Sequence, residues 1–153
     1  LAWAGGLLAR TRSITVFATL HAPLMHPVFA AKQMATTDHI GGGRFGLNIV
    51  CGWNADEFEM FGVTPGDHEK RYEWAQEWWD VIQLAWSDKE DVDFIGQHMN
   101  MRGIRAKPKP YGGSRPVVMN AGASASPDRT DVTRALMSVS MSAGEPPPTA
   151  VAP

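Results

Sequence analysis

The chain alternates short apolar runs with longer segments in which apolar side chains recur every three or four positions. Residues 14–20 (ITVFATL) are rich in β-branched and aromatic side chains and predict a buried strand. From Pro27 to about Ile40 the apolar positions follow helical spacing. Glycines at 41–43 predict the end of this helix, because glycine readily adopts the left-handed conformation that terminates helices.

The middle of the chain repeats this alternation. Residues 45–52 predict a second buried strand. Asn54 then predicts the start of a short helix that ends near Gly62, and Glu57 stands at the spacing of a capping box. Residues 64–67 (TPGD) predict the start of a helix of about 20 residues. Its apolar positions are spaced by three and four: Tyr72, Ala75, Trp79, Ile82 and Trp86.

The last predicted elements are a hairpin within 94–104 (FIGQHMNMRGI), a Pro/Gly linker at 107–116 (KPKPYGGSRP) and a third strand from about Val117 to Gly122. Apolar strands that alternate with helices are typical of a parallel sheet covered on both faces. We therefore predict an α/β fold, either a doubly wound sheet or a (β/α)8 barrel. No GxGxxG motif follows a strand, which disfavours a dinucleotide-binding sheet. Three strands cannot close a barrel, so a barrel would be present only in part.

Composition narrows the class of protein. Hydrophobic residues make up 44% of the chain and charged residues 20%, which is typical of globular domains. The net charge of -2 gives no electrostatic reason to expect nucleic acid or an anionic membrane as a partner. No apolar run reaches the roughly 18 residues of a membrane span. The single cysteine, Cys51, excludes an internal disulfide and fits a reducing cytoplasm.

The end of the chain differs from the rest. Residues 127–153 contain no aromatic residue and have neither helical nor strand periodicity, so they predict a disordered tail. Their bias toward Arg, Pro, Ala, Thr and Ser is also what GC-rich DNA gives when it is translated out of frame, and we expect such a boundary near codons 124–128. The chain begins at Leu1 within what reads as a helix, so we expect a piece of a longer protein.

Polar side chains occur in and after the predicted strands, which is where ligands bind in α/β folds. Asn48 interrupts an apolar strand. It is either a strand amide bonded to neighbouring backbone or an amide directed at a polar ligand, since an unpaired buried amide costs about 1–3 kcal/mol. Glu57 is either the capping-box acid, which its spacing favours, or a residue of the same site.

Two other segments are candidate anion sites. Arg71 and Tyr72 are either a solvated residue and a core residue, or a clamp for a phosphate. Residues 120–124 (NAGAS) are either an ordinary strand-to-helix turn or a turn whose backbone N–H groups approach an anion. The five histidines show no metal-binding spacing, so no metal is predicted, and only His21 directly follows a strand.

Three blocks of the sequence, in this order, resemble the bacterial luciferase-like flavin-dependent monooxygenases: HPVFAAKQMATTDHIGGGRFGLNIVCGWNADEFEMFG, RYEWAQEWWDVIQLAW and KPKPYGGSRPVVMNAGAS. The resemblance is nearest to the branch that oxidises alkanesulfonates, dimethylsulfone and pyrimidines, and it covers about residues 1–126. It implies a partial TIM barrel with about the third to fifth strands and their helices. Residues 1–126 would form this partial domain, and 127–153 would be the disordered or frameshifted tail.

The resemblance also implies a chemistry. The cofactor would be reduced FMN supplied by a separate NAD(P)H-dependent flavin reductase, with O2 as co-substrate. The substrate would be a small organic molecule such as an alkanesulfonate or a pyrimidine, and the intact protein could form a homo-oligomer. FMN contacts would map onto Asn48 and Glu57 near the isoalloxazine and ribityl groups. The further implied residues are Arg71, Tyr72 and Ser124 toward the phosphate, Thr19 facing the flavin, and His21 as the catalytic candidate.

Two alternatives stay open at this point. The chain departs from the family because two barrel strands are missing before Leu1 and the family continuation is missing after Ser126. It could therefore be a non-catalytic truncated remnant of such an enzyme. It could also come from a deazaflavin-dependent reductase of the same superfamily, which uses a similar pocket.

Overall fold

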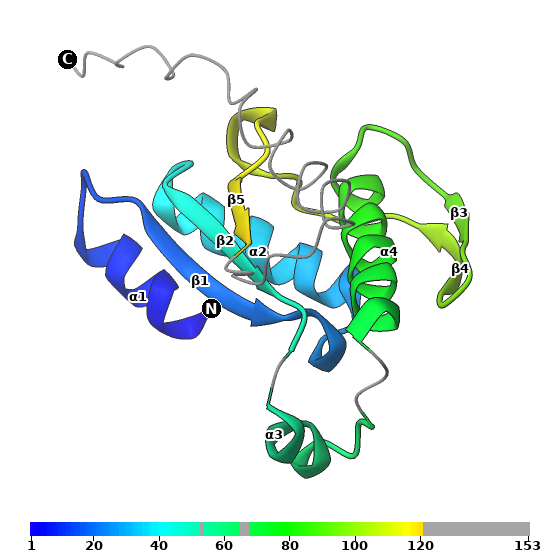
Figure 1. The fold of residues 1–153 in the computed structure, drawn as a ribbon. Coiled ribbons are helices and arrows are strands. Elements are labelled where there is room, and N and C mark those ends of the chain that lie inside the picture. The colour runs from blue at the N-terminus through cyan, green and yellow to red at the C-terminus, as the bar shows by residue number, and fades with distance from the viewer. Residues whose placement is uncertain (53, 65–67, 121–153) are drawn as a thin grey trace, which may run out of the picture.

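The computed structural model describes residues 1–52, 54–64 and 68–120 of the 153-residue chain (Figure 1). The elements in chain order are α1 (Ala2–Arg10), β1 (Val16–His21), the 3-10 turn η1 (Ala22–Leu24), α2 (Pro27–Gly41), β2 (Phe45–Val50), α3 (Ala55–Met60), α4 (His68–Trp86), β3 (Val92–Ile95), β4 (Asn100–Ile104), the 3-10 turn η2 (Tyr111–Gly113) and β5 (Val117–Asn120). The predicted strands, helices and hairpin are confirmed within these residues. The tail predicted at 127–153 lies outside them.

Three strands form a parallel sheet in the order β1-β2-β5. Thr19 lies opposite Asn48, and Asn48 lies opposite Met119, so these three positions form one row across the sheet. Strands β3 and β4 form a separate antiparallel ribbon beside α4 (Figure 1). The predicted α/β fold with a parallel sheet is therefore confirmed.

The two faces of this sheet have different environments. The helix-covered face is formed by alternate residues of the three strands that are buried against α2 and α4: Ala18, Leu20, Phe45, Leu47, Ile49 and Val118. The opposite face, called the open face below, carries Phe17, Thr19, His21, Gly46, Asn48, Val50, Val117 and Met119. Phe17 is 42% exposed and Met119 47%. The sequence predicted a sheet covered on both faces. Within the described residues, helices cover only one of them.

Tryptophans fix α4 against the rest of the domain. Trp78 and Trp79 are both fully buried. Trp78 Nε1 donates a hydrogen bond of 2.6 Å to the carbonyl oxygen of Met25, next to η1. Trp86 Nε1 donates one of 3.0 Å to the carbonyl oxygen of Ala31 in α2. The first half of α4 is thereby held beside the loop that follows β1, at the carboxyl end of the sheet.

The predicted Pro/Gly linker at 107–116 connects β4 to β5 and is held in place by two helices. The buried Asp38 of α2 accepts a hydrogen bond of 2.9 Å from the backbone N–H of Tyr111. Lys109 Nζ donates to the carbonyl oxygens of Ala85 and Ser87 at the end of α4, at 3.0 and 2.6 Å. Because α2 and α4 both hold it, this segment delivers the chain to β5 in a defined position.

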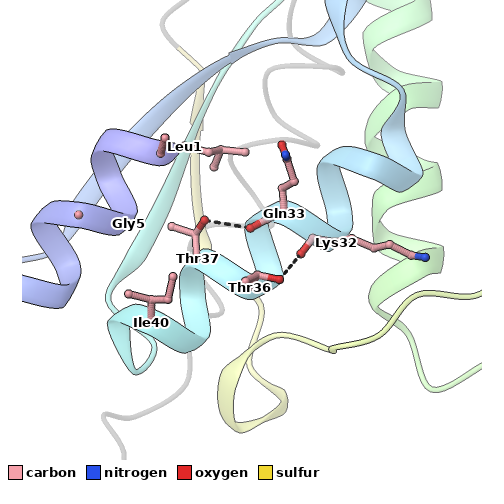
Figure 2. A pocket seen from close by; sticks show the side chains of 9 residues that line it. Leu1, Gly5, Lys32, Gln33, Thr36, Thr37 and Ile40 are labelled. Carbon is pink, nitrogen blue, oxygen red and sulfur yellow. Dashed lines mark hydrogen bonds between the residues drawn. The ribbon is translucent and has the colours of Figure 1, made fainter.

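A cavity of about 450 Å³ lies between α1 and α2, with Leu1 and Gly5 on one side and Thr37 and Ile40 on the other (Figure 2). The hydroxyl of Thr37 donates to the carbonyl of Gln33 within α2, so it is already satisfied (Figure 2). Of the predicted site residues that the structure describes, none lines this cavity. Among the helices described, none is both long and apolar enough to cross a membrane.

Candidate functional site

Thr19 and Asn48 form a pair on the open face near the carboxyl ends of β1 and β2. Because they occupy the same row of a parallel sheet, their side chains point the same way. Asn48 Nδ2 donates a hydrogen bond of 3.1 Å to Thr19 Oγ1. The alternative of a strand amide bonded to neighbouring backbone is therefore wrong for this nitrogen, whose partner is a side-chain hydroxyl.

The other polar atom of Asn48 has no such partner. Asn48 Oδ1 is buried and accepts no hydrogen bond from any residue that the structure describes. A buried carbonyl oxygen without a donor costs about 1–3 kcal/mol, so proteins rarely leave one unsatisfied. This oxygen fits a donor N–H or O–H group of a bound polar ligand.

Glu57 does not form the predicted capping box. Asn54 occupies the N-cap position of α3, as predicted, but its side chain makes no capping hydrogen bond. Glu57 Oε2 instead lies 3.6 Å from Nδ1 of His21, at the end of β1. The first turn of α3 therefore carries a carboxylate toward a neighbouring strand end. A local spacing rule misses such a partner, because the partner belongs to a distant segment of the chain.

His21 is half-enclosed at this strand end, with 26% of its side chain exposed, against 35% for Glu57. Its Nδ1 is buried, and it forms no hydrogen bond of normal length within the described part of the chain. Together with Thr19 and Asn48, the pair gives the open face a cluster of four polar side chains, which we call the strand-end cluster: Thr19, His21, Asn48 and Glu57.

Arg71 and Tyr72 lie on the first half of α4, which the Trp78–Met25 bond holds beside η1. Arg71 Nε is buried and has no hydrogen-bond partner among the described residues. Tyr72 is half-buried and packs on the hydrophobic core. Among the described residues, no hydrogen bond or ion pair links Arg71 to the strand-end cluster. Ser124 lies outside the described residues.

The shifted pKa values belong to groups away from this cluster. Burial raises the pKa of Asp38, and the N–H groups of Tyr111 and Phe45 and the nearby His39 partly oppose it. Burial also raises the pKa of Asp80, and repulsion from Glu77 adds to the increase, while a hydrogen bond from Gln76 opposes it. Over the described ranges, no three His, Cys, Asp or Glu side chains lie together as a metal site.

Two glycines shape the cluster, and the sequence reasoning assigned them no role. A Cβ at Gly46 would lie 2.5 Å from the ring of Phe17, so this ring lies directly against the β2 backbone on the open face. Gly52 has φ of +92°, and a Cβ there would overlap the ring of Phe58. The available signal was a glycine inside an apolar strand, which often marks a close approach of another group. Here Gly46 makes room for an aromatic surface beside Asn48, and Gly52 turns the chain into α3.

Comparison with known proteins identifies relatives. A family model described as luciferase-like monooxygenase matches residues 1–152. Pyrimidine monooxygenase RutA of Acinetobacter baylyi is 39% identical over 107 residues, which cover 69% of this chain and 29% of the relative. RutA of Escherichia coli O139:H28 is 37% identical over 107 residues, which cover 69% and 27%. The chain thus spans less than a third of the length of these relatives.

Solved structures share the fold. Riboflavin lyase RcaE, determined with modified FMN and riboflavin, superposes with a TM-score of 0.72 and 25% identity over 79% of this chain and 32% of that chain. DmoA from Hyphomicrobium sulfonivorans gives a TM-score of 0.69 with 22% identity, over 80% of this chain and 31% of that chain. The second likeness concerns the fold alone. Since the family model matches almost the entire chain, the protein belongs to the luciferase-like monooxygenase family.

Proposed function

We propose that the chain is part of a flavin-dependent monooxygenase in which reduced FMN and O2 oxygenate a small organic substrate. The observation that carries this proposal is the buried Oδ1 of Asn48, which has no donor among the described residues and lies beside Thr19 at the carboxyl end of a parallel sheet. Family membership supports the reaction class. The 39% identity to a protein named as a pyrimidine monooxygenase makes a pyrimidine such as uracil the first substrate to test.

In this proposal β1, β2 and β5 are the third, fourth and fifth strands of a (β/α)8 barrel. Their parallel order and the helices on one face support this placement. The inside of such a barrel is filled by side chains from all the strands, so part of it should be apolar and incompletely covered. Phe17, Val117 and Met119 on the open face have this character, with 42%, 38% and 47% of their surface exposed.

The described residues fit FMN as the cofactor. An isoalloxazine ring offers N–H and C=O groups at its edge, and Asn48 Oδ1 is an acceptor that lacks a donor. Arg71 Nε is a buried donor without an acceptor, as a phosphate contact would require. Thr19 and Glu57 would complete the ring side of the site, with Tyr72 and Ser124 on the phosphate side. Reduced FMN, when bound, supplies the electrons that activate O2.

The residues of this chain would bind the cofactor and orient it for the reaction. The Thr19–Asn48 hydrogen bond fixes the amide so that its oxygen points to one place. Phe17 supplies an apolar surface next to this amide, which helps to exclude water from the reacting groups. A separate NAD(P)H-dependent flavin reductase, as the source of reduced FMN, and a homo-oligomeric state of the intact enzyme belong to the same proposal.

The test uses the protein at its natural length. FMN is titrated by quenching of flavin fluorescence, and the reduced complex is then mixed with O2 and either uracil or an alkanesulfonate. We expect oxygenated product, and we expect Asn48→Ala to weaken FMN binding by roughly 5- to 150-fold, from a lost hydrogen bond of about 1–3 kcal/mol. Asn100→Ala, at an exposed position in β4, is the matched control. Wild-type protein that binds no flavin would contradict the proposal, and unchanged affinity in Asn48→Ala would remove Asn48 from the site.

A further inference from the structure

We propose that His21 is the catalytic base that takes a proton from the substrate, and that Glu57 is the positioning residue that orients its ring. This inference rests on the proposed flavin-dependent function and adds a proton-transfer step to it. The substrate class it fits is a cyclic amide or imide, such as a pyrimidine, whose ring N–H group is weakly acidic. Deprotonation makes such a ring richer in electrons and therefore easier to oxygenate.

The strand geometry brings His21 to the site. His21 is the last residue of β1, and it shares the open face with Thr19 because side chains alternate along a strand. It therefore occupies the row next to the Thr19–Asn48 pair, toward the carboxyl ends of the strands. A ligand held by Asn48 Oδ1 would lie within the neighbourhood of this imidazole.

Glu57 determines which ring nitrogen carries the proton. The carboxylate can only accept hydrogen bonds, and its Oε2 is the group next to Nδ1, at 3.6 Å. This distance exceeds a hydrogen bond, but Glu57 is 35% exposed and its flexible side chain needs to move only about half an ångström. Nδ1 then donates to the carboxylate, which leaves Nε2 unprotonated and able to accept a proton.

Nε2 is available for this role. The His21 side chain forms no hydrogen bond in the described part of the chain, and 26% of it is accessible. Its buried nitrogen is Nδ1, so the accessible side of the ring carries Nε2. In the proposed step the substrate N–H bond breaks, its electron pair stays on the substrate, and an Nε2–H bond forms. The resulting imidazolium pairs with the Glu57 carboxylate and later returns its proton to product or water.

Another histidine–carboxylate pair in the described chain lacks this placement. His98 Nε2 lies 3.3 Å from Glu73 Oε2, but that pair joins the hairpin to α4, away from the sheet. The other explanation for His21–Glu57 is a structural tie between β1 and α3. The two explanations differ in what the ring does when the flavin is bound, and in which variants still fold and bind it.

The first measurement determines which ring nitrogen of His21 carries the proton, and it does not depend on catalytic activity. The protein at its natural length is labelled with ¹⁵N-histidine, and the His21 ring signals are assigned from their absence in His21→Gln. We expect the Nδ1–H tautomer in the wild type and a loss of this preference in Glu57→Ala. Glu59→Ala, on the same helix but exposed, is the matched control and should leave the tautomer unchanged. A wild-type ring with its proton on Nε2 would overturn the proposal.

The second measurement separates proton transfer from flavin binding. We expect His21→Gln to lower kcat for the oxygenated product by about 10²- to 10⁴-fold, with the Kd for FMN and the KM within about twofold of wild type. Reduced flavin should still react with O2 but release hydrogen peroxide, and added imidazole should restore product in His21→Ala. His26→Gln, at an exposed position before α2, is the control and should behave like wild type.

The outcomes distinguish this inference from the proposed function. If the wild type oxygenates uracil and His21→Gln does so at the same rate, His21 is not the base and the monooxygenase proposal stands. If His21→Gln loses flavin binding or folding, and imidazole restores nothing in His21→Ala, the pair is a structural tie. If the wild type shows no flavin-dependent oxygenation at all, the proposed function itself has failed.

Discussion

Glu77 on α4 holds the turn that joins β3 to β4, and removing its carboxylate should loosen this turn specifically. Glu77 Oε1 accepts the N–H of Gln97 at 2.6 Å. Glu77 Oε2 accepts the N–H groups of His98 and Met99, both at 2.9 Å. One side chain thus provides the acceptor for three consecutive backbone donors of the turn.

The size of the effect follows from these three bonds. A hydrogen bond to a charged group contributes about 1.5–3 kcal/mol, and water would replace part of each bond here because Gln97 is exposed. We therefore expect Glu77→Ala to lower the free energy of local opening by about 2–4 kcal/mol, which is roughly a 30- to 1,000-fold faster amide exchange. Glu77→Gln keeps an oxygen on one side only and should have an intermediate effect.

Hydrogen exchange followed by mass spectrometry, on peptides that cover residues 94–101, measures this opening. Glu73→Ala is the control, because Glu73 Oε2 lies 3.3 Å from the ring nitrogen Nε2 of His98 rather than next to a backbone N–H of the turn, and its side chain is 56% exposed. A Cβ at Gly96 would collide with the Glu77 carboxylate, so Gly96→Ala should mimic Glu77→Ala, and the two changes should not add. Unchanged exchange in Glu77→Ala, or equal acceleration in β1 and α2, would refute this account of the turn.

Other predictions concern stability. Burial raises the pKa of Asp80 in the folded state, so this group adds stability below its unfolded pKa and loses it as pH rises through the folded value. The free energy of unfolding, measured in urea, should therefore decrease less steeply above about pH 4 in Asp80→Asn than in the wild type. The same pH dependence in both proteins would contradict this. Trp86→Phe should lower the unfolding free energy by about 2–4 kcal/mol in urea, because the buried carbonyl of Ala31 loses the indole N–H and the smaller ring fills less of the core. A cost below about 1 kcal/mol would mean that water replaces the indole donor and neighbouring side chains close the gap. Asn54→Ala should cost less than about 0.5 kcal/mol, since Asn54 makes no capping bond, and the usual loss of about 1 kcal/mol would show that it caps α3.

The elements were predictable where local chemistry decides them. The helix from Pro27 ends at Gly41, and Gly42 takes the left-handed conformation with φ of 57° and ψ of 46°, as the run of glycines indicates. The three- and four-residue spacing of apolar side chains on α4 likewise matches a buried stripe, in which Ala75, Trp79 and Ile82 are almost fully covered. These features depend on residues that are only a few positions apart, so they can be read from the sequence alone.

The predictions that failed depend on partners that are distant in the chain. Glu57 has capping-box spacing, but the capping bond competes with a contact to His21, and only the packing of α3 beside β1 reveals that contact. The composition of 107–116 correctly indicates a linker, but it does not indicate that Asp38 and the last turn of α4 hold this linker in place. The partner of Asn48 follows from the register of β1 and β2, which a single sequence does not determine.

The strand-end cluster differs from an ordinary set of structural hydrogen bonds in one respect. Each of its two pairs directs one polar atom of a side chain toward the neighbouring side chain, and another atom of that side chain has no hydrogen-bond partner among the described residues. Asn48 uses Nδ2 toward Thr19 and leaves Oδ1, and His21 turns Nδ1 toward Glu57 and leaves Nε2. A Thr19–Asn48 pair that served only folding would gain by satisfying Oδ1 of Asn48 as well, since an unsatisfied buried atom costs free energy. Orientation of a side chain combined with an unused polar atom is the arrangement that a preorganised binding site requires.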